Sequence, residues 1–160
     1  MLALLILIIK YRASCQKDKE KICRLYLKNT KYINNWDLVD VTAKHIVGDC
    51  LRDKDKTALY ELAGSPLLWD RRIAIISTFD FIENGQFEDT IKISKILLSD
   101  KHDLIHKAVG WMLREVGKRS LKTEEDFLKA HYRSMPRTML RYAIEKFPED
   151  KRQKYLNRVQ

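Results

Sequence analysis

Apolar residues recur at the spacing of an α-helix along nearly the whole chain. The clearest stretch covers residues 105–116, where one face carries Ile105, Ala108, Val109, Met112, Leu113 and Val116. Only five glycines and three prolines interrupt the 160 residues, too few for the many turns of a β-sandwich or barrel. The pattern therefore predicts an all-α protein.

Turn formers and polar clusters divide the pattern into about ten helices joined by short loops. The expected breaks lie near residues 31–34, 51–55, 64–66, 84–85, 99–101, 120–123, 134–136 and 147–148. Three start signals accompany them: Asn34 or Asn35 as an N-cap, Ser65-Pro66, and the acidic run that opens at Thr123.

Paired in order, these helices form five hairpins, and tryptophans fall in the first helix of three of them. Trp36, Trp69 and Trp111 are 33 and 42 residues apart, close to the roughly 40-residue period of HEAT-type repeats. We expect residues 1–160 to form one domain, a superhelical array of HEAT-like hairpins (an α-solenoid), with the three tryptophan helices side by side. A globin-like cluster of helices is the alternative.

The first helix is unusual because residues 2–9 are all apolar. A helix that is apolar on every side is normally buried on every side, so we expect neighbours all round it, one of them absent from this chain. The run is shorter than the roughly 20 residues that span a bilayer, and no basic residue precedes it as in a signal peptide. These features predict no membrane partner, a cytoplasmic location and self-association through the bare helix.

The cysteines and histidines give no sign of a metal or cofactor. Cys15, Cys23 and Cys50 form no CxxC pair, and the four histidines have no ligand spacing with them. We expect three reduced thiols, no metal site and no cofactor.

The charge of the chain points to a polyanionic partner. Lysine and arginine number 31 against 22 aspartates and glutamates, a formal net charge of +9. Such a field attracts nucleic acid or an anionic membrane surface.

One carboxylate stands beside a tryptophan without an obvious structural reason. Trp36 and Asp40 are four residues apart and share a helix face. Asp37 lies in the first turn, where the helix dipole favours a carboxylate. Asp40 lies one turn further on, and it is either a solvated helix carboxylate or a functional group.

Basic residues recur on the later helices. Guanidinium forks suit phosphate oxygens, although each of these residues can equally belong to a solvated, salt-bridged face. The candidates for DNA binding are Arg71, Arg72, Lys107, Arg114, Arg137 and Arg141. Gly110 directly precedes Trp111 inside a helix, where glycine costs about 1 kcal/mol against alanine. That position indicates close approach by another backbone or by a ligand.

At these residues the sequence resembles the HEAT-like-repeat alkylpurine DNA glycosylases (AlkD type). The family pattern Trp-Asp-x-Val-Asp matches residues 36–40, Trp-x-x-Arg followed by an apolar run matches residues 69–74, and Lys-Ala-x-Gly-Trp-x-Leu-Arg-Glu matches residues 107–115. Residues 135–145 resemble the family's last repeat. The likeness begins near residue 20, and family members usually carry further helices before the point where this chain starts.

The resemblance implies a monofunctional DNA glycosylase that excises cationic N3- and N7-alkylated purines, such as 3-methyladenine and 7-methylguanine, from duplex DNA. It gives Asp40 the role of catalytic carboxylate, lets Trp36 and Trp111 pack against the damaged nucleotide, and has Arg72 bind a nearby phosphate. It also implies that the chain is truncated at its N-terminus. The alternatives are a catalytically inactive DNA-binding or scaffold remnant and a protein–protein adaptor.

Overall fold

The structure is a computed structural model, and it describes residues 2–157. Every regular element within that range is helical. The first half contains α1 (Leu2–Ala13), α2 (Gln16–Lys28), η1 (Thr30–Tyr32), α3 (Trp36–Ala43), η2 (Lys44–Gly48), α4 (Asp49–Leu51) and α5 (Thr57–Ala63). The second half contains α6 (Leu68–Glu83), α7 (Glu88–Ile96), η3 (Leu97–Ser99), α8 (Asp103–Gly117), α9 (Leu121–His131), α10 (Arg137–Ala143), η4 (Ile144–Lys146) and α11 (Glu149–Leu156).

The predicted all-α class is confirmed, and so is the number of helices. Eleven α-helical segments are labelled, but α3 and α4 are joined without a break by the π-helical turns of η2. Counted as one helix they give ten in the described range. All eight predicted breaks are present, and one more occurs between α1 and α2.

Two of the predicted helix starts are wrong by a few residues. The helix after Ser65-Pro66 begins at Leu68, because the Ser65 hydroxyl accepts the Leu67 N–H and donates to Asp70 in a turn ahead of the helix. Likewise α9 begins before Thr123, at Leu121. Asn35 does precede α3, but its side chain makes no capping hydrogen bond.

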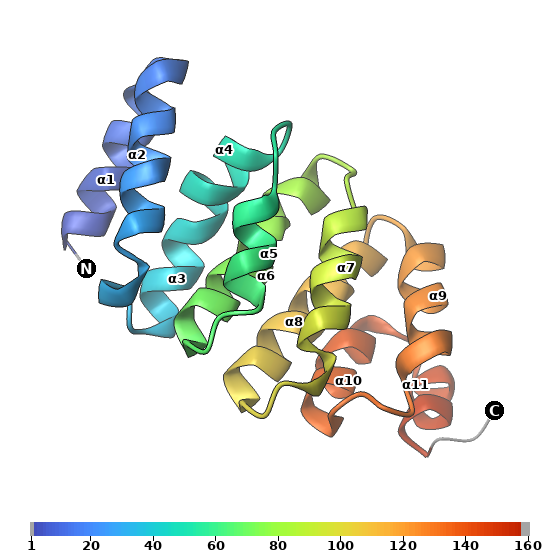
Figure 1. Ribbon diagram of the computed structural model, residues 1–160. Coiled ribbons are helices and arrows are strands. Elements are labelled where there is room, and N and C mark those ends of the chain that lie inside the picture. The colour runs from blue at the N-terminus through green and yellow to red at the C-terminus, as the bar shows by residue number, and fades with distance from the viewer. Residues whose placement is uncertain (1, 158–160) are drawn as a thin grey trace.

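Alternate helices pack against one another along the chain. Helix α3 contacts α6, α6 contacts α8, and α8 contacts α10, while α5, α7 and α9 pack against this row (Figure 1). The three tryptophan helices α3, α6 and α8 therefore lie side by side, as predicted. Their N-terminal ends point the same way, which brings the first turns of these helices to one edge of the molecule.

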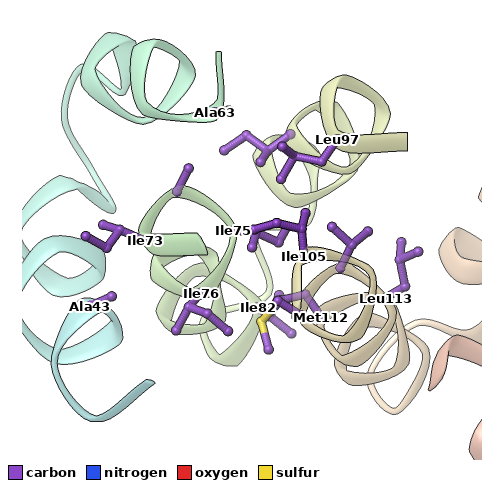
Figure 2. Packing of buried hydrophobic residues seen from close by; sticks show 14 of the residues in the cluster. Ala43, Ala63, Ile73, Ile75, Ile76, Ile82, Leu97, Ile105, Met112 and Leu113 are labelled. Atoms are coloured by element: carbon purple, nitrogen blue, oxygen red, sulfur yellow. The ribbon is translucent and has the colours of Figure 1, made fainter. Parts of the chain in front are cut away.

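The core lies between these rows of helices. Helix α6 is central and is buried on all sides, with ten buried residues. Figure 2 shows its Ile75, Ile76 and Ile82 beside Ile105 and Met112 of α8. All six apolar residues that defined the predicted face of α8 are fully buried. Apart from Ala108, each of these side chains contributes about 1.5–3 kcal/mol relative to an exposed one.

Helix α1 departs from the prediction that it would be buried all round. Neighbours cover one side only, where it contacts α2, α3 and η2. Ile8 and Tyr11 are buried on that side, whereas Leu2 and Ile9 are 72% and 67% exposed. Within the described residues, α1 thus presents an uncovered apolar face.

A buried carboxyl group lies between α8 and α9. The Glu124 side chain packs directly against Gly117, and its Oε1 atom has no hydrogen-bond partner in the described part of the chain. Burial raises the pKa of Glu124 to about 8; the nearby Glu125 adds to this shift, and Lys151 and Arg114 oppose it. The folded protein therefore holds this carboxyl group in its neutral form at pH 7.

This carboxyl group predicts a stability that falls as the pH rises. Between the ordinary pKa of glutamate near 4.5 and the folded pKa near 8, only the unfolded chain ionises, so the free energy of unfolding falls by a few kcal/mol across this window. Urea denaturation from pH 5 to 8 measures this change. The Glu124→Gln variant should lack this part of the fall, whereas Glu125→Gln should retain it. Equal pH dependence in wild type and Glu124→Gln would contradict the assignment.

Candidate active site

The tryptophan helices α3, α6 and α8 border an open surface cavity of about 420 Å³. Four helices contribute to it: α3, α6, α8 and α10. Its lining consists of Trp36, Asp40, Arg72, Leu104, Lys107, Trp111, Arg114 and Tyr142. The three residues predicted to do the chemistry, Trp36, Asp40 and Trp111, are thus brought together from positions as far as 75 residues apart.

Asp40 is held in one orientation by Arg72. The arginine Nε donates to Asp40 Oδ1 at 2.9 Å, and its Nη2 donates to Oδ2 at 2.7 Å. A third bond runs from Arg72 Nη1 to the carbonyl oxygen of Leu104 at 2.5 Å. The Asp40 side chain is 17% exposed and that of Arg72 only 6%. The carboxylate is therefore both fixed and within reach of a molecule in the cavity.

Two tryptophans offer aromatic surfaces at the cavity. Trp36 is the first residue of α3 and is 54% exposed. Trp111 is half-buried because its ring packs edge-on against Phe79, with centroids 5.6 Å apart, and its Nε1–H donates to Glu115 Oε1 at 3.2 Å. Trp69 does not line the cavity but packs against the core.

Gly110 explains how α10 reaches the cavity. A Cβ atom at this position would lie 2.4 Å from the Met139 carbonyl oxygen and 2.5 Å from Tyr142 Cβ. The glycine predicted to allow close backbone approach does so, and the approaching backbone is that of α10. This contact brings Tyr142 to the cavity that Trp111 also lines. The sequence pattern had not indicated Tyr142 as a residue of the site.

The predicted DNA-binding arginines near the cavity are engaged within the protein. Arg71 donates to Asp100 at 2.6 Å and to the carbonyl oxygens of Ser65 and Pro66, so it ties the loops before α6 and α8 together. Arg72 was expected to bind a phosphate, but it is buried and its charge is paired with Asp40. These two guanidinium groups position the protein's own atoms because acidic and carbonyl partners surround them.

The other four predicted DNA-binding residues differ in exposure. Arg114 is paired with Glu145 and lies close to Glu115, and Arg137 donates to the carbonyl oxygen of Leu156. Lys107 forms an ion pair with Asp103 at 2.7 Å but remains partly exposed. Arg141 is exposed on α10.

A second hollow of about 530 Å³ continues from the first. It shares Lys107 and Tyr142 with the cavity and is bordered by α8, α10 and α11. The remaining lining residues are Asp103, Thr138, Arg141, Glu145 and Arg152. Together the two hollows form a groove that runs from Trp36 on α3 to Arg141 on α10.

Within residues 2–157, no group of three or more histidine, cysteine or acidic side chains is placed to hold a metal ion. In the same range no helix has both the length and the apolar character needed to cross a membrane.

Comparison with known proteins identifies the family. A family model described as DNA alkylation repair enzyme matches residues 1–147, which include the whole cavity. No curated protein and no solved structure matches the chain. A match over most of the chain shows that this protein belongs to the DNA alkylation repair enzyme family.

Proposed function

We propose that the protein is a monofunctional DNA glycosylase that hydrolyses the N-glycosidic bond of cationic N3- or N7-alkylated purines in duplex DNA. The proposal rests chiefly on one observation: a carboxylate, Asp40, is fixed by a buried arginine beside two aromatic surfaces in an open cavity. The family supports a role in DNA repair.

The chemistry of an alkylated purine suits a site that offers one carboxylate. The base already carries a positive charge, so it leaves without protonation by a general acid. When the bond between C1′ and the base breaks, its electron pair neutralises the purine and positive charge develops on the sugar. A fixed carboxylate at that place stabilises the developing cation. Asp40 can also accept the proton that the attacking water loses as it adds to C1′.

The aromatic residues add attraction for the same charge. An exposed aromatic face beside a cation contributes about 0.5–2 kcal/mol. Trp36 and Trp111 border the same cavity as Asp40, so we assign them to contacts with the sugar and backbone of the damaged nucleotide. We assign Arg72 to the orientation of Asp40, because the buried guanidinium group of Arg72 is already paired with the Asp40 carboxylate.

The arrangement of helices supports an open site. We propose that the packed row α3, α6, α8 and α10 is the inner face of a solenoid of HEAT-like hairpins. Glycosylases with enclosed pockets flip the base into them. The lining of this cavity comes from four neighbouring helices of the row and is open to solvent, which suits capture of a lesion against the protein surface.

Strand cleavage after base release is not part of the proposal. A lyase needs an unprotonated amine as nucleophile, and Lys107 is the one lysine among the cavity residues. The hydrogen bond from Lys107 to Asp103 raises the pKa of its ammonium group, which disfavours the free amine. We therefore expect intact abasic strands as the product. We also propose that the protein works in the cytoplasm, where thiols stay reduced.

The test is the release of free 7-methylguanine and 3-methyladenine from methylated duplex DNA by the purified protein, followed by chromatography. Release of both bases without strand breaks is the expected result. A well-folded protein that binds DNA but releases neither base would be the inactive DNA-binding remnant, and the proposal would fail.

We also propose that the exposed face of α1 mediates self-association. Leu2, Leu5, Ile6 and Ile9 form this face, and burying such a patch against a second copy removes apolar surface from water. Sedimentation velocity should show a concentration-dependent dimer that Ile6→Glu abolishes. As a control, Leu121→Glu alters an isolated exposed leucine and should leave the dimer intact. A wild-type monomer at high concentration would contradict the proposal.

A further inference from the structure

Positive charge is concentrated at one end of the chain. Residues 1–35 contain eight basic and two acidic residues and so carry +6 of the net +9. The remaining 125 residues contain 23 basic and 20 acidic residues and carry only +3. The part of the chain that holds the cavity is therefore close to neutral.

The cavity itself offers few free cations for a phosphate backbone. The two arginines that line it, Arg72 and Arg114, are paired with carboxylates, and each side chain is less than one-fifth exposed. Its one lining lysine, Lys107, is partly exposed and pairs with Asp103. Affinity for duplex DNA depends mainly on cations that neutralise phosphates. A protein that binds DNA at this cavity must obtain most of those contacts elsewhere on its surface.

Helix α2 provides a surface of the required kind. Its cationic face carries Lys17, Lys21, Arg24 and Lys28, at successive intervals of four, three and four residues that keep them on one side of the helix. These four side chains border a shallow hollow of about 380 Å³ together with Leu25. Lys17 and Lys28 are about 17 Å apart along the helix axis. This length matches the spacing of roughly five phosphates on one strand of a duplex.

The carboxylates near this face do not neutralise it. Lys21 pairs with Asp18 and Arg24 with Glu20, and both basic side chains are largely exposed. Exposed pairs of this kind are worth about 0–1 kcal/mol and exchange readily for phosphate. Among the described residues, Lys17 and Lys28 form no ion pair with a carboxylate.

In the chain, η1 connects α2 to the cavity residue Trp36. Lys31 and Tyr32 follow the end of α2, both exposed, with the lysine Nζ 5.0 Å from the centre of the tyrosine ring. Four residues later Trp36 begins α3 and borders the cavity. In Figure 1 the C-terminal end of α2 and the start of α3 lie at the same edge of the molecule.

We propose that the cationic face of α2, with Lys31 and Tyr32 of η1, binds the phosphate backbone of the duplex that flanks the lesion. The inference rests on the proposed function, since it names DNA as the partner. The two surfaces then have separate roles. Helix α2 supplies affinity for DNA that does not depend on sequence or damage, and the cavity recognises and processes the lesion.

The test compares two variants with the same change in charge. The first replaces Lys17, Lys21, Arg24 and Lys28 by glutamine. The control replaces four exposed lysines outside this surface, Lys95, Lys101, Lys122 and Lys154. Glutamine has nearly the helix propensity of lysine and arginine, so both variants should fold, as thermal unfolding will verify. Binding to an undamaged duplex is measured by fluorescence anisotropy over a range of salt concentrations.

We expect the α2 variant to bind at least tenfold more weakly at low salt. The slope of log affinity against log salt concentration is negative, and its magnitude should decrease by about 3–4 in the α2 variant, since each phosphate contact contributes roughly 0.9. The control should keep most of the wild-type slope. Equal losses in both variants, or no loss in the α2 variant, would overturn the inference. Binding to undamaged DNA tests the role of α2 and does not depend on base release. Failure of the wild type to release alkylated bases would therefore refute the proposed function separately.

Discussion

The Asp40→Asn variant should release alkylated bases at least 10²–10³-fold more slowly than wild type. That range is typical when one electrostatic stabiliser of a transition state is removed. The asparagine amide keeps the shape of the side chain and one oxygen for Arg72, but it lacks the negative charge that we propose stabilises the sugar cation. Affinity for undamaged duplex should change little, because the cationic contacts lie elsewhere. Single-turnover kinetics on methylated DNA measures the effect.

Asp37→Asn is the matched control. Asp37 lies three residues earlier on α3, and its Oδ1 accepts the backbone N–H of Leu38 outside the cavity. It should retain nearly full activity. Because Asp40→Asn leaves the buried Arg72 without its counter-charge, which can cost 3–5 kcal/mol in comparable buried pairs, its folding must be checked by thermal unfolding. Equal rates for a folded Asp40→Asn and the wild type would refute the catalytic role.

The Gly110→Ala variant should lose much of its stability. The new Cβ would lie 2.4 Å from the Met139 carbonyl oxygen, 2.5 Å from Tyr142 Cβ and 3.2 Å from the Ala143 nitrogen. Two of these atoms belong to the backbone, so α10 as a whole must move away from α8. Overpacking of this kind costs about 1–3 kcal/mol and occasionally more, and the rigid neighbours here favour the upper end. The gain of about 1 kcal/mol in helix propensity offsets only part of the loss.

Gly64→Ala is the control for the glycine change itself. A Cβ at Gly64 meets its nearest atoms at 3.7 and 3.8 Å, and its backbone φ of −89° is open to any residue. This variant should be as stable as wild type or slightly more stable. Urea denaturation compares the two. A Gly110→Ala protein with wild-type stability would show that α8 and α10 do not pack as closely as described.

Local patterns in the sequence were enough to predict the helices and to select candidate residues that the structure brings together. The apolar face of α8 depends only on helical spacing, so all six of its predicted residues are buried. The motif residues Trp36, Asp40 and Trp111 lie at one cavity, because their motifs fall on helices of the same packed row.

Contacts between distant segments were not predictable in the same way. The partners of Arg71 and Arg72 lie about 30 residues away, at Asp100, Asp40 and Leu104, and no local pattern indicates them. For the same reason Tyr142 was missed, since its place at the cavity depends on how α10 packs on Gly110. The exposed face of α1 likewise depends on which neighbours cover it, and an all-apolar sequence does not specify them.

The most direct test of the central claim uses a duplex in which a positively charged pyrrolidine ring replaces the sugar of one nucleotide. This group imitates the cation that Asp40 is proposed to stabilise, and analogues of a transition state bind more tightly than substrates do. The measurement is the affinity for this duplex relative to an unmodified one. We predict a preference of 10²-fold or more in the wild type that is lost in Asp40→Asn and kept in Asp37→Asn. An equal preference in all three proteins would contradict the claim.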